Sequence, residues 1–392
     1  MAQWIVRRDR LTGEQIPIVE SPLNKNMWIA GFAGSGKSIV LVHRAIWIVD
    51  NNPNAKVVLI VYTRSLVDMY KTGLATLGYQ NIEVKTIYEF MNGGTMYDYV
   101  LCDEVQDCTD SMIQEIQSRA RQSVTVAGDK FQSIFEKDVW YNQPTIDPQT
   151  LTTSLNARQE ELTTIERLTP SIIEAVDKFL PAMKLATNAK PNAQKVDINI
   201  KLCKTKTQRD EATYIYGDAE RFLRNYERTA ILFHRHTSCI DFANFILDSK
   251  GKPVWNTVLN KYNKPDFGSL NRHLAQNGIK LMYIGNGYGS LKEAEINSIG
   301  VMMTYQSAKG LDFENVYIPF ASSNMFITYS DARSRTIFMV AMTRSGKNLT
   351  ITYAGQPHSY VNSFRTVRNI CNEIDLTITP PAVQTSGNEF DF

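Results

Sequence analysis

Residues 31–38 read GFAGSGKS and stand between the apolar run 27–30 and a helical pattern that begins at Ser38. A glycine-rich turn that joins a buried strand to a helix directs backbone N–H groups and the helix N-terminus at one point, an arrangement that suits phosphate oxygens. Lys37 supplies a point charge for the β- and γ-phosphates, and Ser38 supplies a hydroxyl for Mg²⁺. The predicted phosphate-binding residues are Gly31, Ala33, Gly34, Ser35, Gly36, Lys37 and Ser38.

The first half of the chain alternates short apolar runs with helical patterns. The apolar runs are rich in β-branched residues, end on Gly or polar residues, and cover 27–31, 56–63, 97–104 and 123–129. The helical patterns between them cover 38–50, 64–78 and 110–122. Such alternation is typical of buried parallel strands connected by helices, so we expect an α/β domain with polar groups at the carboxyl ends of its strands.

A second series of the same kind follows residue 160. Its expected strands are 228–235, 298–307, 315–321 and 348–355, and its expected helices include 168–180 and 239–251. The sequence therefore predicts two α/β domains with mostly parallel sheets. The expected limits are an N-terminal domain over 1–160, a C-terminal domain over 161–375 with a short loop-rich insertion about 252–297, and a flexible tail over 376–392.

The overall composition excludes several classes of protein. Forty-two Lys and Arg against 40 Asp and Glu give a net charge of +2, so a nucleic-acid partner would need a local groove rather than a basic surface. The five cysteines form no C-x-x-C pair, which disfavours a disulfide framework or a zinc ribbon and favours a reducing compartment. No apolar run reaches about 18 residues and the first residues lack an apolar signal region, so we expect a cytoplasmic protein.

An acidic pair, Asp103 and Glu104, follows the expected strand that begins at Tyr97. After a strand such a pair usually lies in a solvated loop. Beside a P-loop, however, an Asp can hold Mg²⁺ and the next Glu can take the proton of the attacking water. The combination predicts hydrolysis of a nucleoside triphosphate.

Further polar residues follow other expected strands. Gln106 lies close after Glu104, while Asp129 and Gln132 follow the next strand, and their side chains can contact a γ-phosphate or relay its loss. In the second half, Lys309, Asp312 and Arg344 stand near strand ends. An arginine brought across a cleft between domains can stabilise phosphoryl transfer, although a single Arg lies by default on the surface.

In order along the chain, these motifs resemble those of the UvrD/Rep (UvrD/PcrA-like) group of superfamily 1 DNA helicases. LTGEQ (11–15) resembles the adenine-reading Q motif, GFAGSGKS motif I, VYTRS (61–65) motif Ia and DEVQD (103–107) motif II. AGDKFQSIF (127–135) resembles motif III and LTTIERLTPSII (162–173) motif IV. TYQSAKGLDF (304–313) and VAMTRSGKNLTITYA (340–354) resemble motifs V and VI.

The resemblance implies two RecA-like domains that clamp ATP and Mg²⁺ between them and carry single-stranded DNA, typically stepping 3′ to 5′. It implies that Gln15 reads the adenine, Arg167 and Arg344 reach the γ-phosphate, and Asp312 lies near the ribose. The predicted catalytic residues are Lys37, Asp103, Glu104, Gln132, Arg167 and Arg344, with Ser38 and Asp103 at the metal.

A nucleic-acid groove needs aromatic platforms for bases and polar donors for phosphates. Tyr62 stands where motif Ia would offer a stacking aromatic, although a core aromatic at a strand end is an equal alternative. Thr63, Thr86, Ser307 and Lys309 are the expected contacts to the nucleic-acid backbone. RNA in place of DNA stays an alternative.

The sequence departs from the resembled family at several points. Glu166 replaces the usual aromatic before the motif IV arginine, which leaves Gln15 alone for adenine. Lys137 and Asp138 replace the usual Trp-Arg pair after motif III. The short spacings before Asp103 and before motif V indicate a minimal core without the large accessory insertions.

Three functions remain to be compared. The first is an ATP-dependent single-stranded DNA translocase or helicase. The second is an ATP-gated regulatory or signalling subunit of a DNA-repair or anti-phage defence complex, with a protein partner and little unwinding activity of its own. The third, a small-molecule kinase, fits poorly because it explains none of the motifs after residue 130.

Overall fold

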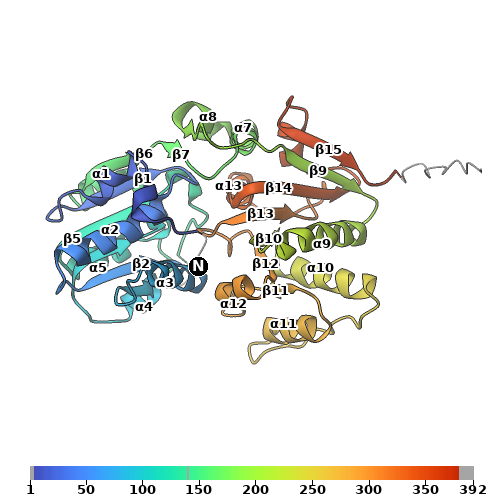
Figure 1. Ribbon diagram of the computed structural model, residues 1–392, viewed down its shortest axis with the longest axis horizontal. Helices are drawn as coiled ribbons and strands as arrows, with labels where there is room; N and C mark the ends of the chain where they lie inside the picture. The colour runs from blue at the N-terminus through green and yellow to red at the C-terminus, as the bar shows by residue number, and fades with distance from the viewer. Residues whose placement is uncertain (1–3, 139–140, 379–392) are drawn as a thin grey trace, which may run out of the picture.

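The computed structural model describes residues 4–138 and 141–378. Within them the chain forms two large sheets that lie side by side, one of six strands and one of seven (Figure 1). Every pair of neighbouring strands in these two sheets is parallel. The expected α/β architecture with mostly parallel sheets flanked by helices is confirmed.

The first sheet has the strand order β3-β2-β4-β5-β1-β6. Its strands are β1 (Met27–Gly31), β2 (Val57–Val61), β3 (Glu83–Thr86), β4 (Tyr97–Cys102), β5 (Ala120–Gly128) and β6 (Arg158–Leu162). The helices and short 3-10 turns around it are η1 (Arg8–Arg10), α1 (Gln15–Val19), α2 (Lys37–Asn51), α3 (Arg64–Thr76), α4 (Ile87–Met91), η2 (Val105–Asp107), α5 (Asp110–Ser118), η3 (Lys130–Gln132), η4 (Pro148–Thr150) and α6 (Leu151–Ser154).

Strand β2 shows why this sheet is covered on both faces. All five of its residues are buried. Val57, Leu59 and Val61 belong to one apolar core, which also takes in residues of α2 and α3. Val58 and Ile60 point the other way, into a second core with residues of α4 and α5. Side chains alternate along a strand, so a fully apolar strand predicts helices on both faces.

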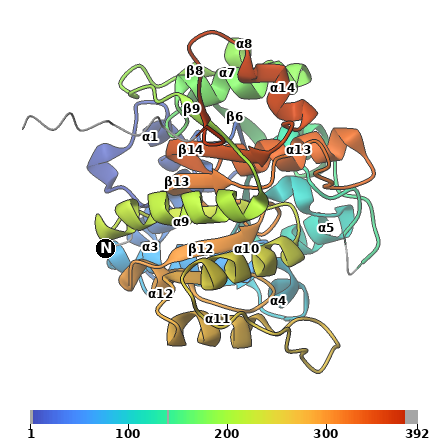
Figure 2. The same ribbon diagram turned by 90° about the vertical axis from the view of Figure 1, so that its right-hand side faces the viewer.

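The second sheet has the strand order β11-β12-β10-β13-β14-β9-β15. Its strands are β9 (Ile200–Thr205), β10 (Thr229–Phe233), β11 (Leu281–Tyr283), β12 (Gly300–Thr304), β13 (Phe313–Ile318), β14 (Ser345–Ala354) and β15 (Cys371–Asp375). Its helices are α9 (Gln208–Arg224), α10 (His236–Ser249), α11 (Phe267–Gln276), α12 (Leu291–Ile296), α13 (Asp331–Met342) and α14 (Ser359–Arg365). Helices α9 and α10 cover the face of the sheet that Figure 2 turns toward the viewer.

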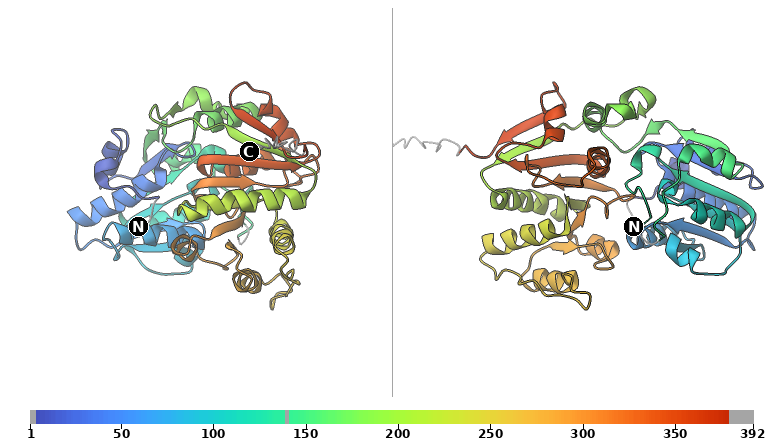
Figure 3. Two further views of the ribbon diagram at one scale, coloured as in Figure 1. Left: turned by 45° about the vertical axis from the view of Figure 1, so that its right-hand side comes forward. Right: turned by 180° about the vertical axis from the view of Figure 1, so that it is seen from behind.

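A connecting region joins the two sheets. It contains β7 (Thr164–Ile165), α7 (Pro170–Phe179), η5 (Pro181–Met183), α8 (Leu185–Asn188) and β8 (Lys190–Pro191). Phe179, at the end of α7, packs edge-to-face on Phe338 of α13 with ring centroids 5.7 Å apart. This region therefore packs on the second half of the chain, as the two further views in Figure 3 show.

Helix α13 is buried on all sides over its last turns, from Ile337 to Met342. A helix that is apolar all round must lie inside the protein. Here it lies between α7 and the sheet strands β13 and β14, and it also contacts η3 of the first half. This position brings Thr343 and Arg344, which follow the helix directly, to the boundary between the two halves.

The structure corrects three details of the expected layout. The helix expected over 110–122 ends at Ser118, because β5 begins at Ala120. Strand β6 runs to Leu162, which pairs with Gly31, so the first sheet extends beyond the expected limit at residue 160. The segment 252–297, expected as a short loop-rich insertion, contains α11, α12 and the edge strand β11 of the second sheet. The predicted tail lies, from residue 379 on, outside the described residues.

Across the described residues, no helix has both the length and the apolar character needed to cross a membrane.

Candidate nucleotide site and nucleic-acid groove

The P-loop joins β1 to α2 and is held by its own lysine. Lys37 Nζ donates to the carbonyls of Gly31 at 2.8 Å and Phe32 at 3.0 Å. Gly34 and Gly36 have φ values of 79° and 89°, which favour glycine, and a Cβ at Gly36 would lie 2.4 Å from Gln15 Nε2. The loop therefore has the compact, left-handed path that turns a strand into a helix around a phosphate.

Two observations fit a phosphate at this loop. The hydroxyl of Ser35 is buried and has no hydrogen-bond partner among the described residues. Burial lowers the pKa of the Lys37 ammonium, although Asp129, Glu104 and Asp103 act in the opposite direction. A buried cation beside an unpaired hydroxyl favours an anionic ligand.

The predicted magnesium ligands meet. Ser38 Oγ donates to Asp103 Oδ2 at 2.7 Å, and the hydroxyl of Tyr70 in α3 donates to the same oxygen. Burial, followed by the charge of Glu104, raises the pKa of Asp103. Mg²⁺ is typically bound by one or two protein oxygens together with waters and substrate phosphates, so this hydroxyl–carboxylate pair fits it. Among the described residues there is no group of three or more His, Cys, Asp or Glu that could hold a metal.

Glu104 lies beside this pair in a left-handed conformation, with φ 53°. Gln106 Nε2 donates to its Oε2. Burial raises the pKa of Glu104, but the charges of Lys309 and Lys37 outweigh burial and leave the pKa below its ordinary value. The carboxylate is therefore ionised at neutral pH, which is the state needed to accept a proton from water.

The predicted γ-phosphate residues of the two halves meet in a chain of hydrogen bonds. Arg344 Nη2 donates to Gln132 Oε1 at 3.1 Å. Gln132 Nε2 donates to Asp129 Oδ2 at 2.8 Å, and the Asp129 N–H donates to Gln106 Oε1 at 3.1 Å. Through Gln106 this chain ends on Glu104, so the arginine of the second half is linked to the candidate base of the first.

Arg167 reaches the same place from the connecting region. Its Nη2 donates to the carbonyl of Thr343 at 2.7 Å, and its backbone N–H donates to the carbonyl of Gly34 at 3.2 Å. Its Nε is buried without a partner among the described residues. Arg167 therefore touches both the P-loop and the residue before Arg344, and its buried Nε donor is unused within the described part of the chain.

Gln15 and Asp312 occupy the flanks of this site. Gln15 Nε2 donates to the carbonyl of Ser35 at 3.3 Å, which places this glutamine directly on the P-loop. Asp312 accepts from Arg228 Nη2 at 3.3 Å. Burial raises the pKa of Asp312, but Arg228 and then Arg167 outweigh it, so the carboxylate stays charged beside Arg228.

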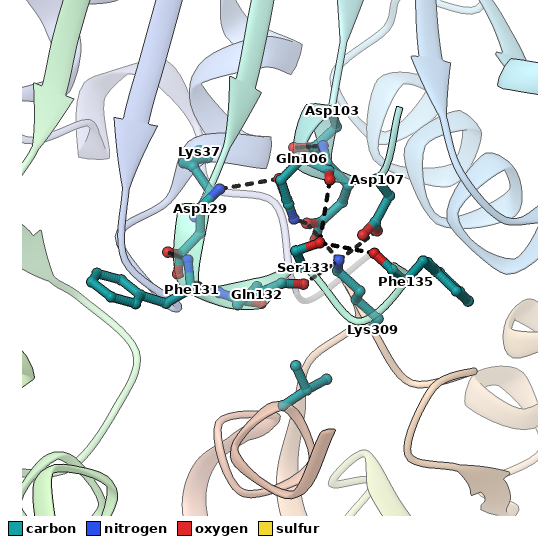
Figure 4. A network of polar contacts seen from close by, with 12 residues as sticks. Lys37, Asp103, Gln106, Asp107, Asp129, Phe131, Gln132, Ser133, Phe135 and Lys309 are labelled. Atoms are coloured by element: carbon teal, nitrogen blue, oxygen red, sulfur yellow. Dashed lines mark hydrogen bonds and ion pairs between the residues drawn. The ribbon is translucent and has the colours of Figure 1, made fainter. Parts of the chain in front are cut away.

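The structure corrects the role expected of Lys309. We expected Lys309 to contact a nucleic-acid backbone, but its side chain is only 5% exposed and points into the interdomain contact. It forms an ion pair with Asp107, and its Nζ lies 2.5 Å from the carbonyl of Gln132 (Figure 4). The same Nζ lies 3.8 Å from Glu104 Oε2. We name the group of Lys37, Asp103, Glu104, Asp107, Gln132, Lys309 and Arg344 the interdomain site.

The other expected nucleic-acid residues divide into two sets. Thr63 and Ser307 line one groove of about 490 Å³, together with Arg64 and the turn 285–289. Thr86 does not face it, because its buried hydroxyl accepts from the Glu89 N–H in a capping box at the start of α4. The role expected of Thr86 is thus corrected to capping.

Tyr62 directly precedes the groove residue Thr63 and belongs to an aromatic cluster. Its ring stacks on Phe135 with centroids 5.5 Å apart. Its hydroxyl donates to Asp138 Oδ2 at 3.0 Å, and Tyr88 donates to the same oxygen at 2.7 Å. One face of Tyr62 is thus already stacked inside the protein, and its polar end is held by a buried carboxylate.

Three residues of the site were absent from the sequence prediction. Asp107 holds Lys309, Tyr70 holds Asp103, and Arg44 holds α1. The last letter of DEVQD was the only available signal for Asp107. Tyr70 and Arg44 stand within helical patterns and gave none, because their partners are distant in sequence.

Two protein-family models match parts of this chain. Residues 24–208 match the Schlafen group 3 DNA/RNA helicase domain, and residues 260–356 match the UvrD-like helicase C-terminal domain. No curated protein matches the chain.

Solved structures of similar shape include two viral helicases. The arterivirus nonstructural protein 10 helicase is 13% identical with a TM-score of 0.43, and the match covers 89% of this chain and 63% of that one. The PRRSV helicase is 15% identical with a TM-score of 0.42, and the match covers 86% and 54%. The chain thus spans less than two thirds of the length of these helicases. A helicase-domain model thus matches in each half of the chain.

Proposed function

We propose that this chain hydrolyses ATP with Mg²⁺ and couples the hydrolysis to movement along single-stranded DNA, in the 3′ to 5′ direction. The observation that carries the proposal is the hydrogen-bond chain from Arg344 through Gln132, Asp129 and Gln106 to Glu104. It joins the candidate base of one domain to a cation of the other. Loss of a γ-phosphate between them changes the charge that both domains face, which favours opening.

The residues of the nucleotide site have the following proposed roles. Lys37, Arg167 and Arg344 face the phosphates, Ser38 and Asp103 hold the metal, and Glu104 accepts the proton of the attacking water. Gln15 reads the base from its place on the P-loop. Glu166 adds no stacking surface and accepts from Asn192 Nδ2 at 2.6 Å, so base recognition depends on Gln15.

The groove supports nucleic acid as the polymer along which the protein moves. It takes Thr63 from the first half and Ser307 from the second, so a strand lying in it would contact both domains and feel their closure. Hydroxyl groups and an adjacent arginine suit phosphates, whereas sequence readout is unnecessary for a motor. RNA is the second arm of the test, because the matched N-terminal domain is described as a DNA/RNA helicase domain.

We assign the nucleotide-binding domain to residues 1–162 and the second domain to 163–375, with the boundary moved to the end of β6. The five cysteines are free thiols, which supports a reducing compartment, and we place the protein in the cytoplasm.

A second candidate function is an ATP-gated signalling subunit in a repair or defence complex. Asp138 favours it, because this carboxylate holds both Tyr62 and Tyr88 in place of a free stacking residue after motif III. A protein with fewer base contacts would bind the strand more weakly. It would signal that the strand is bound rather than unwind a duplex.

The deciding experiment measures the ATPase rate of the full chain alone, with single-stranded DNA, and with RNA of the same sequence. Strand displacement on a duplex with a 3′ tail follows. Stimulation with displacement supports the motor, stimulation without displacement supports signalling, and no stimulation by either polymer refutes a nucleic-acid track.

Two matched variants assign the effect to the groove. Ser307→Glu places a negative charge in the groove and should remove stimulation while leaving the rate without nucleic acid unchanged. Ser249→Glu, at the exposed end of α10, is the control and should behave as the parent chain.

A further inference from the structure

Asp107 is a buried acid to which the proposed mechanism gives no part. It ends η2, four positions after the metal carboxylate Asp103, and none of its side chain is exposed. A carboxylate with no exposed surface needs a charged partner or hydrogen bonds to remain ionised. The residue that pairs with Asp107 therefore indicates the role of Asp107.

The partner comes from the other domain. Lys309 Nζ donates to Asp107 Oδ2, and the two residues are separated by 202 positions in the chain. The second carboxylate oxygen, Oδ1, is buried without a hydrogen-bond partner among the described residues. Burial raises the pKa of Asp107 to about 6, while Lys309 is the strongest influence in the opposite direction.

Lys309 is held among three acceptors, and Asp107 is one of them. The same Nζ lies 2.5 Å from the carbonyl of Gln132 and 3.8 Å from Glu104 Oε2. Without Asp107, the ammonium would face one backbone oxygen and the candidate base alone. It would then move toward Glu104, because an unpaired buried cation is costly and Glu104 is the nearest remaining charge.

The second domain forms hydrogen bonds to the segment after β5 at two points. Lys309 Nζ donates to the carbonyl of Gln132, and Arg333 Nε donates to the carbonyl of Ile134 at 2.8 Å. Figure 4 shows Lys309 reaching between Asp107 and this segment. The Asp107–Lys309 pair therefore fixes both the segment that carries Gln132 and the cation nearest to Glu104.

We propose that Asp107 is a positioning residue: it holds Lys309 of the second domain away from direct contact with Glu104 and against Gln132, and so couples closure of the domains to ATP turnover. The turnover part rests on the proposed function. The positioning part concerns the chain without any ligand and is testable without activity.

The test compares Asp107→Asn, Lys309→Met and the double variant. If Asp107 acts through Lys309, each single variant lowers kcat by about tenfold or more, and the double variant is no slower than Lys309→Met alone, since coupled residues are non-additive. The affinity for a non-hydrolysable ATP analogue stays within about threefold of the parent in all three, because neither residue touches the P-loop. Asp110→Asn, exposed in the same segment, is the control with unchanged kcat.

A second measurement does not require activity. Hydrogen exchange of the 129–135 backbone in the nucleotide-free chain should rise by a similar factor in all three variants and stay unchanged in Asp110→Asn. Parent-like exchange in Asp107→Asn, or losses that add in the double variant, overturns the proposal. An inactive parent chain with the expected exchange pattern would instead contradict only the proposed function. Thermal unfolding identifies a variant that has lost its fold, and Lys309→Met then carries the exchange test.

Discussion

Arg344 Nη2 lies 3.1 Å from Gln132 Oε1, although the two residues are separated by 212 positions in the chain. The arginine also forms hydrogen bonds within its own domain. Its Nη1 donates to the carbonyl of Leu311 at 3.1 Å, and its Nε donates to the carbonyl of Val340 at 2.9 Å. Its Nη2 also donates to Thr343 Oγ1 at 3.1 Å, and a guanidinium held by four separate acceptors has a fixed direction. It is therefore directed toward the first domain.

This orientation predicts how Arg344→Lys behaves. The lysine keeps the charge but loses the planar fork, so the link to Gln132 and the carbonyl anchors cannot all be made. We expect kcat of ATP hydrolysis to fall by about a hundredfold or more, the scale of an arginine that acts only on the transition state. Binding of a non-hydrolysable analogue should change by less than about fivefold. Arg221→Lys, an exposed position of α9, is the control; an equal fall in affinity and kcat would contradict this role.

Glu104→Gln should separate binding from turnover. The amide keeps the size of the side chain but cannot accept the proton of water, so we expect nucleotide binding like that of the parent and a kcat lower by about a hundredfold or more. Lys37→Ala is the complementary variant, because it removes the cation at the phosphates and should abolish nucleotide binding itself. Equilibrium titration with a fluorescent ATP analogue, followed by single-turnover hydrolysis, checks both. An E104Q chain that hydrolyses ATP at the parent rate would refute the assignment.

The pH profile gives a further prediction for the same group. Lys309 is the strongest of the charges that lower the pKa of Glu104. Removing that charge in Lys309→Met should raise the pKa, so the acid limb of kcat moves to higher pH. Lys347→Met, whose exposed ammonium pairs with Glu227, is the control and should leave the limb in place. An unshifted limb in Lys309→Met would show that another group controls it.

The parts of this site that sequence predicts are the ones carried by adjacent residues. A strand, a glycine-rich turn and a helix appear as one continuous pattern, so the P-loop and the pair Asp103–Glu104 could be assigned from order alone. Thr86 is a different case. Its Glu89 three positions later is the signature of a capping box, and this local signal predicts the capping role that the structure shows.

The missed residues depend on contacts that sequence does not display. Tyr70 reads as one apolar position of a helix, and only folding places its hydroxyl on Asp103. Lys309 follows a strand end, where a lysine is usually exposed. Here it is buried, because it forms an ion pair with Asp107 of the other domain. Strand β6 was missed because four of its five residues are exposed or half-exposed, which removes the apolar signal of a strand.

Glu211→Gln should change how stability depends on pH. This buried glutamate of α9 accepts from the Phe320 N–H at 2.8 Å and from Thr352 Oγ1, and burial raises its pKa to about 7 from an ordinary 4.5. Its favourable contribution is therefore complete below about pH 4.5 and is lost as pH rises through 7, because the folded chain then holds a buried charge. The neutral Gln should make the variant more stable than the parent at pH 8 by about 3 kcal/mol, with the advantage shrinking toward pH 5.

Denaturant unfolding at pH 5, 6, 7 and 8 measures this difference. Glu293→Gln, at an exposed position of α12, is the control and should show no such trend. A difference between Glu211→Gln and the parent that does not vary with pH would show that the carboxylate is not the cause.

Arg44→Met should destabilise the chain and weaken nucleotide binding together. Arg44 is fully buried in α2, and its guanidinium donates to Thr125 Oγ1 and to backbone carbonyls at the end of α1 and just after it, those of Ile18, Val19, Ser21 and Pro22. Methionine fills similar space but leaves these carbonyls unsatisfied, so we expect a loss of about 3 kcal/mol in the free energy of unfolding. Because α1 begins at Gln15, the loosened helix should also raise the Kd for ATP more than that for inorganic triphosphate, which lacks a base. Arg10→Met, exposed in η1, should change neither quantity, and a destabilised Arg44→Met with parent-like preference for ATP would separate α1 from base recognition.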